Sequence, residues 1–245
     1  MKPFLLALQF LTIITLRPDL SAGPEDMSKS RAWYGAVGII LGLCLAAASW
    51  LLALVLPALA GAGVLVLLWG ALSRFLHLDG LADTADALVH TTSRERALEI
   101  MKDTRLGAFG LCAVVGILLV KFGALASLPP LDQWRALLLA PGLARALACA
   151  LSVLLPAATP GRGLGAAVSG AQGFWCLAAA AVPALAVAGL AAGVAGMAAA
   201  CAALAVGAAL GQWYMRRLGG VTGDNLGAAI EVSEAAALVT CAALF

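Results

Sequence analysis

The sequence predicts an all-α fold, a polytopic transmembrane helical bundle of about six to eight membrane segments with an acidic active site at its cytoplasmic face. Of the 245 residues, 63% are hydrophobic and 11% are charged, whereas a soluble domain is about 25% charged. The apolar runs have the length of about 20 residues that a membrane-spanning helix needs. The charged residues gather in short segments between these runs. We therefore expect a single integral-membrane domain over residues 1–245.

The predicted spans follow the apolar runs in order. They cover residues 35–56, 58–76, 107–127, 136–158, 174–194, 195–215 and 226–245. The opening run, residues 4–16, is short for a span and predicts a half-inserted or interfacial helix. A secretory signal peptide is not expected, because no small-residue cleavage site precedes Arg17.

The basic residues of the loops predict the orientation. Segments 17–34, 77–106 and 212–225 carry most of the Lys and Arg, and with these spans they fall on one side together with loop 159–173. The positive-inside rule makes that side cytoplasmic. We therefore expect a multi-pass protein of the bacterial inner membrane, embedded in the lipid bilayer, with its active site facing the cytoplasm.

Charge and cysteine content exclude several other classes of protein. The net charge is only +2 and the basic residues are dispersed, so no nucleic-acid partner is expected. The six cysteines are scattered through apolar runs without a Cys-x-x-Cys pair, which argues against a zinc site or a disulfide framework.

The most informative segment is 75–88, which holds three carboxylates in an apolar context. Asp79, Asp83 and Asp86 have the spacing i, i+4, i+7 of one helix face. Like charges at this spacing repel one another, and a bound Mg²⁺ would offset the repulsion and bring phosphates with it. The alternative is a solvated polar face at the membrane surface. We favour Mg²⁺, because a solvated face would accept Lys, Gln or Ser equally well, and we expect the three aspartates to be metal ligands and catalytic residues.

A second polar segment follows at 91–110. Ser93 is a candidate N-cap of an interfacial amphipathic helix. Asp103 can serve as a fourth metal ligand or catalytic carboxylate, and Lys102 and Arg105 can bind phosphate. The alternative is a set of ordinary basic residues at a membrane surface. We favour function for Asp103 and Arg105, because they abut the acidic face across a short hairpin.

A third segment, 218–231, combines glycines with acids. Three glycines in five residues, followed by Thr222 and Asp224, predict a turn whose N–H groups can approach an anion. Glu231 lies seven residues after Asp224 and inside an apolar stretch, where an acid is a functional-site hypothesis by default. The alternative is a glycine turn in which Asp224 is simply the N-cap.

Isolated polar residues complete the candidates. Arg145 lies in mid-span and needs a partner, for which we expect the acidic cluster or a substrate phosphate. Lys121 lies nearer its span end, and snorkelling to the interface is the favoured interpretation. His77 precedes the acidic face, and a structural role is favoured over a catalytic one, because a single His is more often structural. The glycine-rich loop 161–165 is a weak signal without a strand–helix context.

Taken together, these segments favour magnesium-assisted phosphoryl transfer at a membrane surface. Metal and basic side chains would stabilise charge on the transferring phosphate and on the leaving group.

Three stretches resemble the cobalamin synthase family, the adenosylcobinamide-GDP ribazoletransferases of late vitamin B12 synthesis. They are Phe75–Ala87, Leu98–Gly107 and Gly219–Glu231. The likeness runs nearly end to end and includes Phe10-Leu-Thr, Arg145 and Gly163-Leu-Gly165.

The resemblance implies a reaction of adenosylcobinamide-GDP with alpha-ribazole or its 5′-phosphate, which gives adenosylcobalamin or its phosphate and releases GMP with Mg²⁺. Asp79, Asp83 and Asp86 would hold Mg²⁺ and the pyrophosphate, and one of them or Asp103 would be the base. The remaining candidates would bind substrate: His77, Lys102, Arg105, Arg145, Thr222, Asp224 and Glu231.

Two alternatives stay open beside this interpretation. One is an enzyme like the CDP-alcohol phosphotransferases acting on a lipid substrate, disfavoured because Ala82-Asp83 stands where Ala-Arg should follow the first Asp-Gly. The other is a cation-coupled transporter using Glu231 and Arg145, which would predict inverted repeats. The sequence also leaves open whether copies of the chain form a homo-oligomer.

Overall fold

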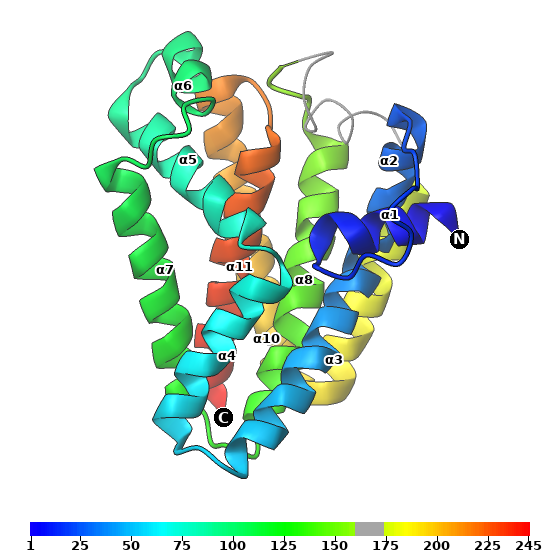
Figure 1. Ribbon diagram of the computed structural model, residues 1–245, viewed down its shortest axis with the longest axis vertical. Helices are drawn as coiled ribbons and strands as arrows, with labels where there is room; N and C mark the ends of the chain where they lie inside the picture. Colours follow the sequence, from blue (N-terminus) through cyan, green and yellow to red (C-terminus); the bar gives the residue numbers. More distant parts are fainter. Residues whose placement is uncertain (160–173) are drawn as a thin grey trace.

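The computed structural model describes residues 1–159 and 174–245, and this part of the chain is a bundle of helices without a β-strand (Figure 1). The helices are α1 (Lys2–Leu11), α2 (Pro24–Ser30), α3 (Tyr34–Ala53), α4 (Ala58–Leu72), α5 (Leu76–His90), α6 (Arg94–Ile100), α7 (Ala108–Ser127), α8 (Gln133–Leu154), α10 (Phe174–Leu218) and α11 (Gly223–Leu244). The predicted all-α membrane bundle is confirmed.

Among the described residues, five helices are long and apolar enough to cross a membrane, or up to six if the bent pair α4–α5 is one span. α10 departs from helical geometry at Gly193, where φ is 53° and ψ is −125°. Cys176, near its start, has its Sγ 3.5 Å from that of Cys149 in α8. Gly211, near its end, packs against Leu151, only two residues further along α8. α10 therefore consists of two antiparallel legs, and the separate spans predicted there are confirmed.

Small residues let α3 and α8 meet backbone to backbone. A Cβ added to Gly38 would stand 2.3 Å from the carbonyl oxygen of Pro141, and one added to Gly42 would stand 2.4 Å from that of Leu138. Both separations are far below van der Waals contact. The small-xxx-small pair in α3 is therefore a genuine helix-packing surface, and α8 occupies the centre of the bundle.

A sharp bend separates α4 from α5. The predicted span 58–76 is wrong at its end, because α4 stops at Leu72 and α5 departs at 87° to it. Arg74 and Phe75, with φ of 55° and 54°, form the break. Left-handed geometry is uncommon for residues other than glycine, so this corner is locally strained. α5 runs from it towards one end of the bundle (Figure 1).

The charged connections gather at that end. α5, α6 and the turn before α11 lie there, whereas the α3–α4 and α7–α8 connections lie at the opposite end (Figure 1). Arg94 fastens α6 in place, since its guanidinium donates to the carbonyl oxygens of Leu218 at 2.7 Å and Ala158 at 2.8 Å. The ten residues of α1 are too few to cross a membrane, and this helix lies across the bundle.

Candidate active site

The acidic stripe of α5 lies against the start of α11. A Cβ added to Gly80 would stand 2.7 Å from the carbonyl oxygen of Asp224. One turn later, Asn225 donates its side-chain N–H to the hydroxyl of Thr84 at 3.2 Å. The two acidic segments, about 140 residues apart in sequence, therefore meet through backbone contact and one buried hydrogen bond.

The carboxylates of this cluster repel one another. Burial, together with the negative charges of Asp79, Asp224 and Asp86, raises the pKa of Asp83 to about 7. α5 turns away from α4 at 87° and runs towards the end of the bundle where the charged connections gather (Figure 1), so the site lies towards that end. A carboxylate whose charged form is disfavoured by its neighbours gains stability when a cation binds.

Asp86 has a structural task that the sequence did not reveal. Its two oxygens accept the backbone N–H groups of Gly107 at 2.8 Å and Gly110 at 2.9 Å. Those N–H groups belong to the N-terminal turn of α7 and have no hydrogen-bond acceptor within their own helix. Asp86 therefore joins α5 to the first turn of α7, and both of its oxygens are engaged.

Asp103 and Arg105 pair with each other. The hydrogen bonds that Asp103 accepts within the described part of the chain all come from Arg105, the shortest at 2.6 Å from Nη2. These hydrogen bonds hold the pKa of Asp103 well below its usual value. The Arg105 side chain is 87% exposed. Neither residue is engaged with the acidic stripe here.

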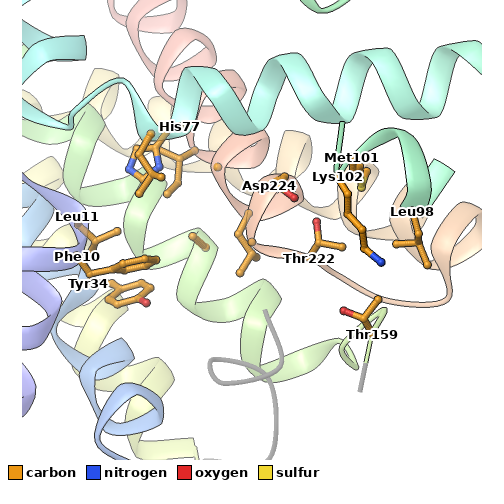
Figure 2. A pocket seen from close by; sticks show the side chains of 16 residues that line it. Phe10, Leu11, Tyr34, His77, Leu98, Met101, Lys102, Thr159, Thr222 and Asp224 are labelled. Atoms are coloured by element: carbon orange, nitrogen blue, oxygen red, sulfur yellow. The ribbon is translucent and has the colours of Figure 1, made fainter. Parts of the chain in front are cut away.

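A pocket of about 270 Å³ opens beside Asp224. Four of the predicted substrate-binding residues line it: His77, Lys102, Thr222 and Asp224. Figure 2 shows Lys102 and Thr222 towards one end, His77 towards the other and Asp224 between them. The N-terminal residues Phe10, Leu11 and Tyr34 also line it. The family resemblance included Phe10 and Leu11, but no role at the site was predicted for any of the three.

The glycine turn shapes the start of α11. Gly219 has a φ of 69°, and Gly220 lies so close to Pro156 that a Cβ would stand 2.3 Å from its carbonyl oxygen. Thr222 is the N-cap, accepting from the backbone N–H of Asn225 at 3.2 Å. The alternative that Asp224 is the N-cap is therefore wrong, and the Asp224 side chain is left to face the pocket.

Deeper in the bundle, four charged side chains form a buried ion network. The ammonium of Lys121 lies 2.6 Å from a carboxylate oxygen of Glu231 and 2.5 Å from one of Glu234. The guanidinium of Arg145 lies 2.6 Å from the other oxygen of Glu234. Trp69 donates its indole N–H to that same oxygen at 3.2 Å. Two positive and two negative charges are thus balanced across α7, α8 and α11, and α4 adds a neutral donor.

This network corrects two predictions. Lys121 does not snorkel to the interface, because its side chain is 4% exposed and lies between two carboxylates. Arg145 pairs with Glu234 and not with the aspartate stripe, since it lies in mid-bundle. Glu231 belongs to the same network. Sequence reasoning missed Glu234, although a second acid three residues after Glu231, on the same helix face, was an available signal.

No group of three or more His, Cys, Asp or Glu side chains is arranged as a metal cage within residues 1–159 and 174–245. Mg²⁺ seldom uses such a cage, because it usually takes one or two carboxylates together with substrate phosphates and water. Paired carboxylates beside an open pocket fit that chemistry. The loop 161–165, with its Gly163-Leu-Gly165, lies outside the described residues.

Comparison with known proteins gives a consistent family match. The model of the family described as Cobalamin-5-phosphate synthase matches residues 3–242. A protein of Geotalea daltonii is 36% identical, covering 100% of this chain and 98% of its own length. One of Pseudomonas paraeruginosa is 42% identical, with 99% and 98% covered, and one of Roseiflexus sp. is 38% identical, with 96% and 87% covered. Each is named adenosylcobinamide-GDP ribazoletransferase. No solved structure matches.

Proposed function

Because this chain belongs to the cobalamin-5-phosphate synthase family, we propose that it joins adenosylcobinamide-GDP to alpha-ribazole, or to alpha-ribazole 5′-phosphate, with release of GMP. Membership makes it a transferase of cobalamin biosynthesis, and its long apolar helices make it a multi-pass membrane protein. The identity of the acceptor, the metal and the membrane side are our proposals.

One observation carries the proposal. Asp224 belongs both to the acidic cluster, through its contact with Gly80, and to the wall of the pocket. A substrate held in the pocket is therefore next to the carboxylates of α5. This is the arrangement that an acceptor hydroxyl and a metal-bound pyrophosphate require, since the reacting groups must be held side by side.

We infer that Asp79 and Asp83 hold Mg²⁺ and that Asp224 lies beside the ion. Carboxylate oxygens are the hard ligands that Mg²⁺ prefers, and the mutual repulsion of these side chains supports a bound cation. When bound, Mg²⁺ neutralises charge on the pyrophosphate. Asp86 would keep α5 and α7 in register, because both of its oxygens are occupied by backbone N–H groups.

The proposed step is an exchange at phosphorus. A ribose hydroxyl oxygen of the ribazole forms a bond to the phosphorus attached to the cobinamide arm. The bond from that phosphorus to the bridging oxygen breaks, and GMP leaves with the electron pair. The proton of the hydroxyl passes to a carboxylate, for which Asp224 is best placed because it lines the pocket. Lys102, also in the pocket wall, would bind a phosphate of either substrate.

The proposed side of the membrane is the cytoplasmic face of the bacterial inner membrane. α6, with Arg94 and Arg96, and the end of α10, with Arg216 and Arg217, lie at the same end of the bundle as the acidic cluster. A concentration of basic residues at one end favours the cytoplasmic side. Both substrates would then reach the site from the cytoplasm.

The test is a transfer assay on the full-length chain in detergent with adenosylcobinamide-GDP, alpha-ribazole and Mg²⁺. We expect GMP and the cobalamin product in equal amounts, no GMP without the ribazole, and loss of both products when a chelator removes Mg²⁺. Release of CMP from a CDP-alcohol and a lipid acceptor, without any GMP release, would overturn the proposal in favour of a lipid phosphotransferase. Cation uptake into liposomes without transfer would favour a transporter.

A further inference from the structure

The two ends of the pocket differ in chemistry (Figure 2). At one end the rings of Phe10 and Tyr34 lie with their centroids 6.4 Å apart and their planes tilted by 32°. At the other end are the Lys102 ammonium and the Thr222 hydroxyl, with Asp224 between the ends. A ligand that matches both ends has a flat apolar part and a polar part.

His77 supplies a buried polar atom at the aromatic end. The residue is 3% exposed and lines the pocket, and its Nε2 has no hydrogen-bond partner within the described part of the chain. A buried nitrogen without a partner is costly, and native structures seldom keep one without a reason. A ligand atom in the pocket would satisfy it.

We propose that the aromatic end of the pocket receives a bicyclic aromatic base, with Nε2–H of His77 donating a hydrogen bond to the free ring nitrogen of that base. The inference rests on the proposed function, in which the base is that of alpha-ribazole. Phe10 and Tyr34 contact the flat hydrocarbon part of the base, where ring contacts are favourable. The ribose then extends towards Asp224, which brings its hydroxyl to the acidic cluster.

Two other occupants fit this end less well. A lipid acyl chain would fill the apolar space but leave Nε2 of His77 without a partner. A guanine base carries donors and acceptors along most of its edge, more than His77 and the Tyr34 hydroxyl can satisfy at this end. A benzimidazole ring needs one donor, at its single free nitrogen, which Nε2–H of His77 supplies, and it presents hydrocarbon to the apolar side chains of this end.

The test is a binding cycle, measured by calorimetry on the full-length chain in detergent without adenosylcobinamide-GDP. The two ligands are alpha-ribazole and its indole analogue, in which CH replaces the free ring nitrogen. We expect His77→Leu to weaken alpha-ribazole binding about tenfold and to leave binding of the indole analogue nearly unchanged. His90→Leu, an exposed residue at the far end of the same helix, is the matched control and should change neither.

An equal effect of His77→Leu on both ligands, or no effect on either, would overturn the inference. This outcome is distinguishable from failure of the proposed function. If the wild type releases GMP normally but His77→Leu affects both ligands equally or neither, only the base subsite is ruled out. If His77→Leu weakens the binding of alpha-ribazole alone but the wild type releases no GMP, the subsite is supported and the proposed reaction is ruled out.

A second pair of variants covers the case in which His77→Leu does not fold. Ala148 of α8 lines this pocket, whereas Ala150 lines a different cavity between α8 and α10. Ala148→Leu should fill the space for the base and reduce alpha-ribazole affinity at least tenfold, and Ala150→Leu should bind like the wild type. Wild-type affinity in Ala148→Leu would contradict the subsite.

Discussion

Gly80 of α5 lies directly on the backbone of Asp224 in α11, so that a Cβ at Gly80 would stand 2.7 Å from the Asp224 carbonyl oxygen and 3.0 Å from its Cα. Backbone cannot move aside as a flexible side chain can. The absence of a side chain at Gly80 lets the aspartate stripe approach the second acidic segment. Gly227 of α11 contributes to the same approach, since a Cβ there would stand 3.3 Å from the Cα of His77. Gly80 makes the tighter of the two contacts, so the distance between the two groups of carboxylates depends most directly on it.

The first prediction is that Gly80→Ala reduces GMP release by at least tenfold, because the added methyl group pushes α5 away from α11. Gly116→Ala in α7 is the matched control, since a Cβ there meets nothing within 4 Å. Alanine is the better helix former by about 1 kcal/mol, so the control should keep its activity and unfold no earlier than the wild type. Wild-type turnover in Gly80→Ala would show that the close approach is not required.

The second prediction concerns Asp86. Asp86→Asn removes the negative charge and one of two acceptors at the start of α7, and we expect a loss of about 1–2 kcal/mol in unfolding free energy. The measurement is the thermal unfolding midpoint in detergent without Mg²⁺. Asp19→Asn, at an exposed position between α1 and α2, should leave the midpoint unchanged. A midpoint for Asp86→Asn equal to the wild type would mean that its bonds to Gly107 and Gly110 do not stabilise the fold.

The third prediction concerns the buried ion network. Lys121→Met leaves Glu231 without an ion-pair partner and Glu234 with Arg145 as its remaining one. We expect this substitution to lower the unfolding free energy by about 3–5 kcal/mol. Adding Glu231→Gln restores the balance of charge and should recover most of that loss. Lys29→Met, which breaks an exposed pair with Glu25, should cost less than about 1 kcal/mol.

Unfolding midpoints and yields of membrane-inserted protein would measure the effect of these Lys121 variants. A double variant that is less stable than Lys121→Met would contradict the charge-balance interpretation.

Membrane orientation is the subject of the fourth prediction. In a chain whose native cysteines are replaced, Leu131→Cys, at a position 82% exposed between α7 and α8, should react with an impermeant maleimide in intact spheroplasts. Arg96→Cys in α6 should react only after the membrane is permeabilised. The reverse pattern would place the acidic cluster outside the cytoplasm and contradict the proposed localisation.

The features that depend on local sequence could be predicted. The lengths of the apolar runs gave the spanning helices, and the i, i+4, i+7 spacing placed Asp79, Asp83 and Asp86 on one helix, which is α5. Ser93 is indeed the N-cap of α6, accepting from the backbone N–H of Arg96. Hydropathy and helical period are sufficient for these predictions, because neither depends on which helices become neighbours.

The features that depend on how the helices dock against one another could not be predicted. The pairing of Lys121 with Glu231 and Glu234 requires knowing the relative height of α7 and α11, and the contribution of Phe10 and Tyr34 to the pocket requires knowing where α1 docks. Hydropathy also did not predict the break at Arg74 and Phe75, because apolar residues flank the short polar pair Ser73-Arg74 on both sides.

The most direct test of the acidic site is GMP release by Asp83→Asn with saturating adenosylcobinamide-GDP, alpha-ribazole and Mg²⁺. Asp132→Asn, at the opposite end of the bundle where its partner is Arg135, is the matched control. We expect Asp83→Asn to insert and unfold like the wild type while GMP release falls by at least a hundredfold, and we expect Asp132→Asn to retain full activity. GMP release at the wild-type rate in Asp83→Asn would contradict the assignment of catalysis to the carboxylates between α5 and α11.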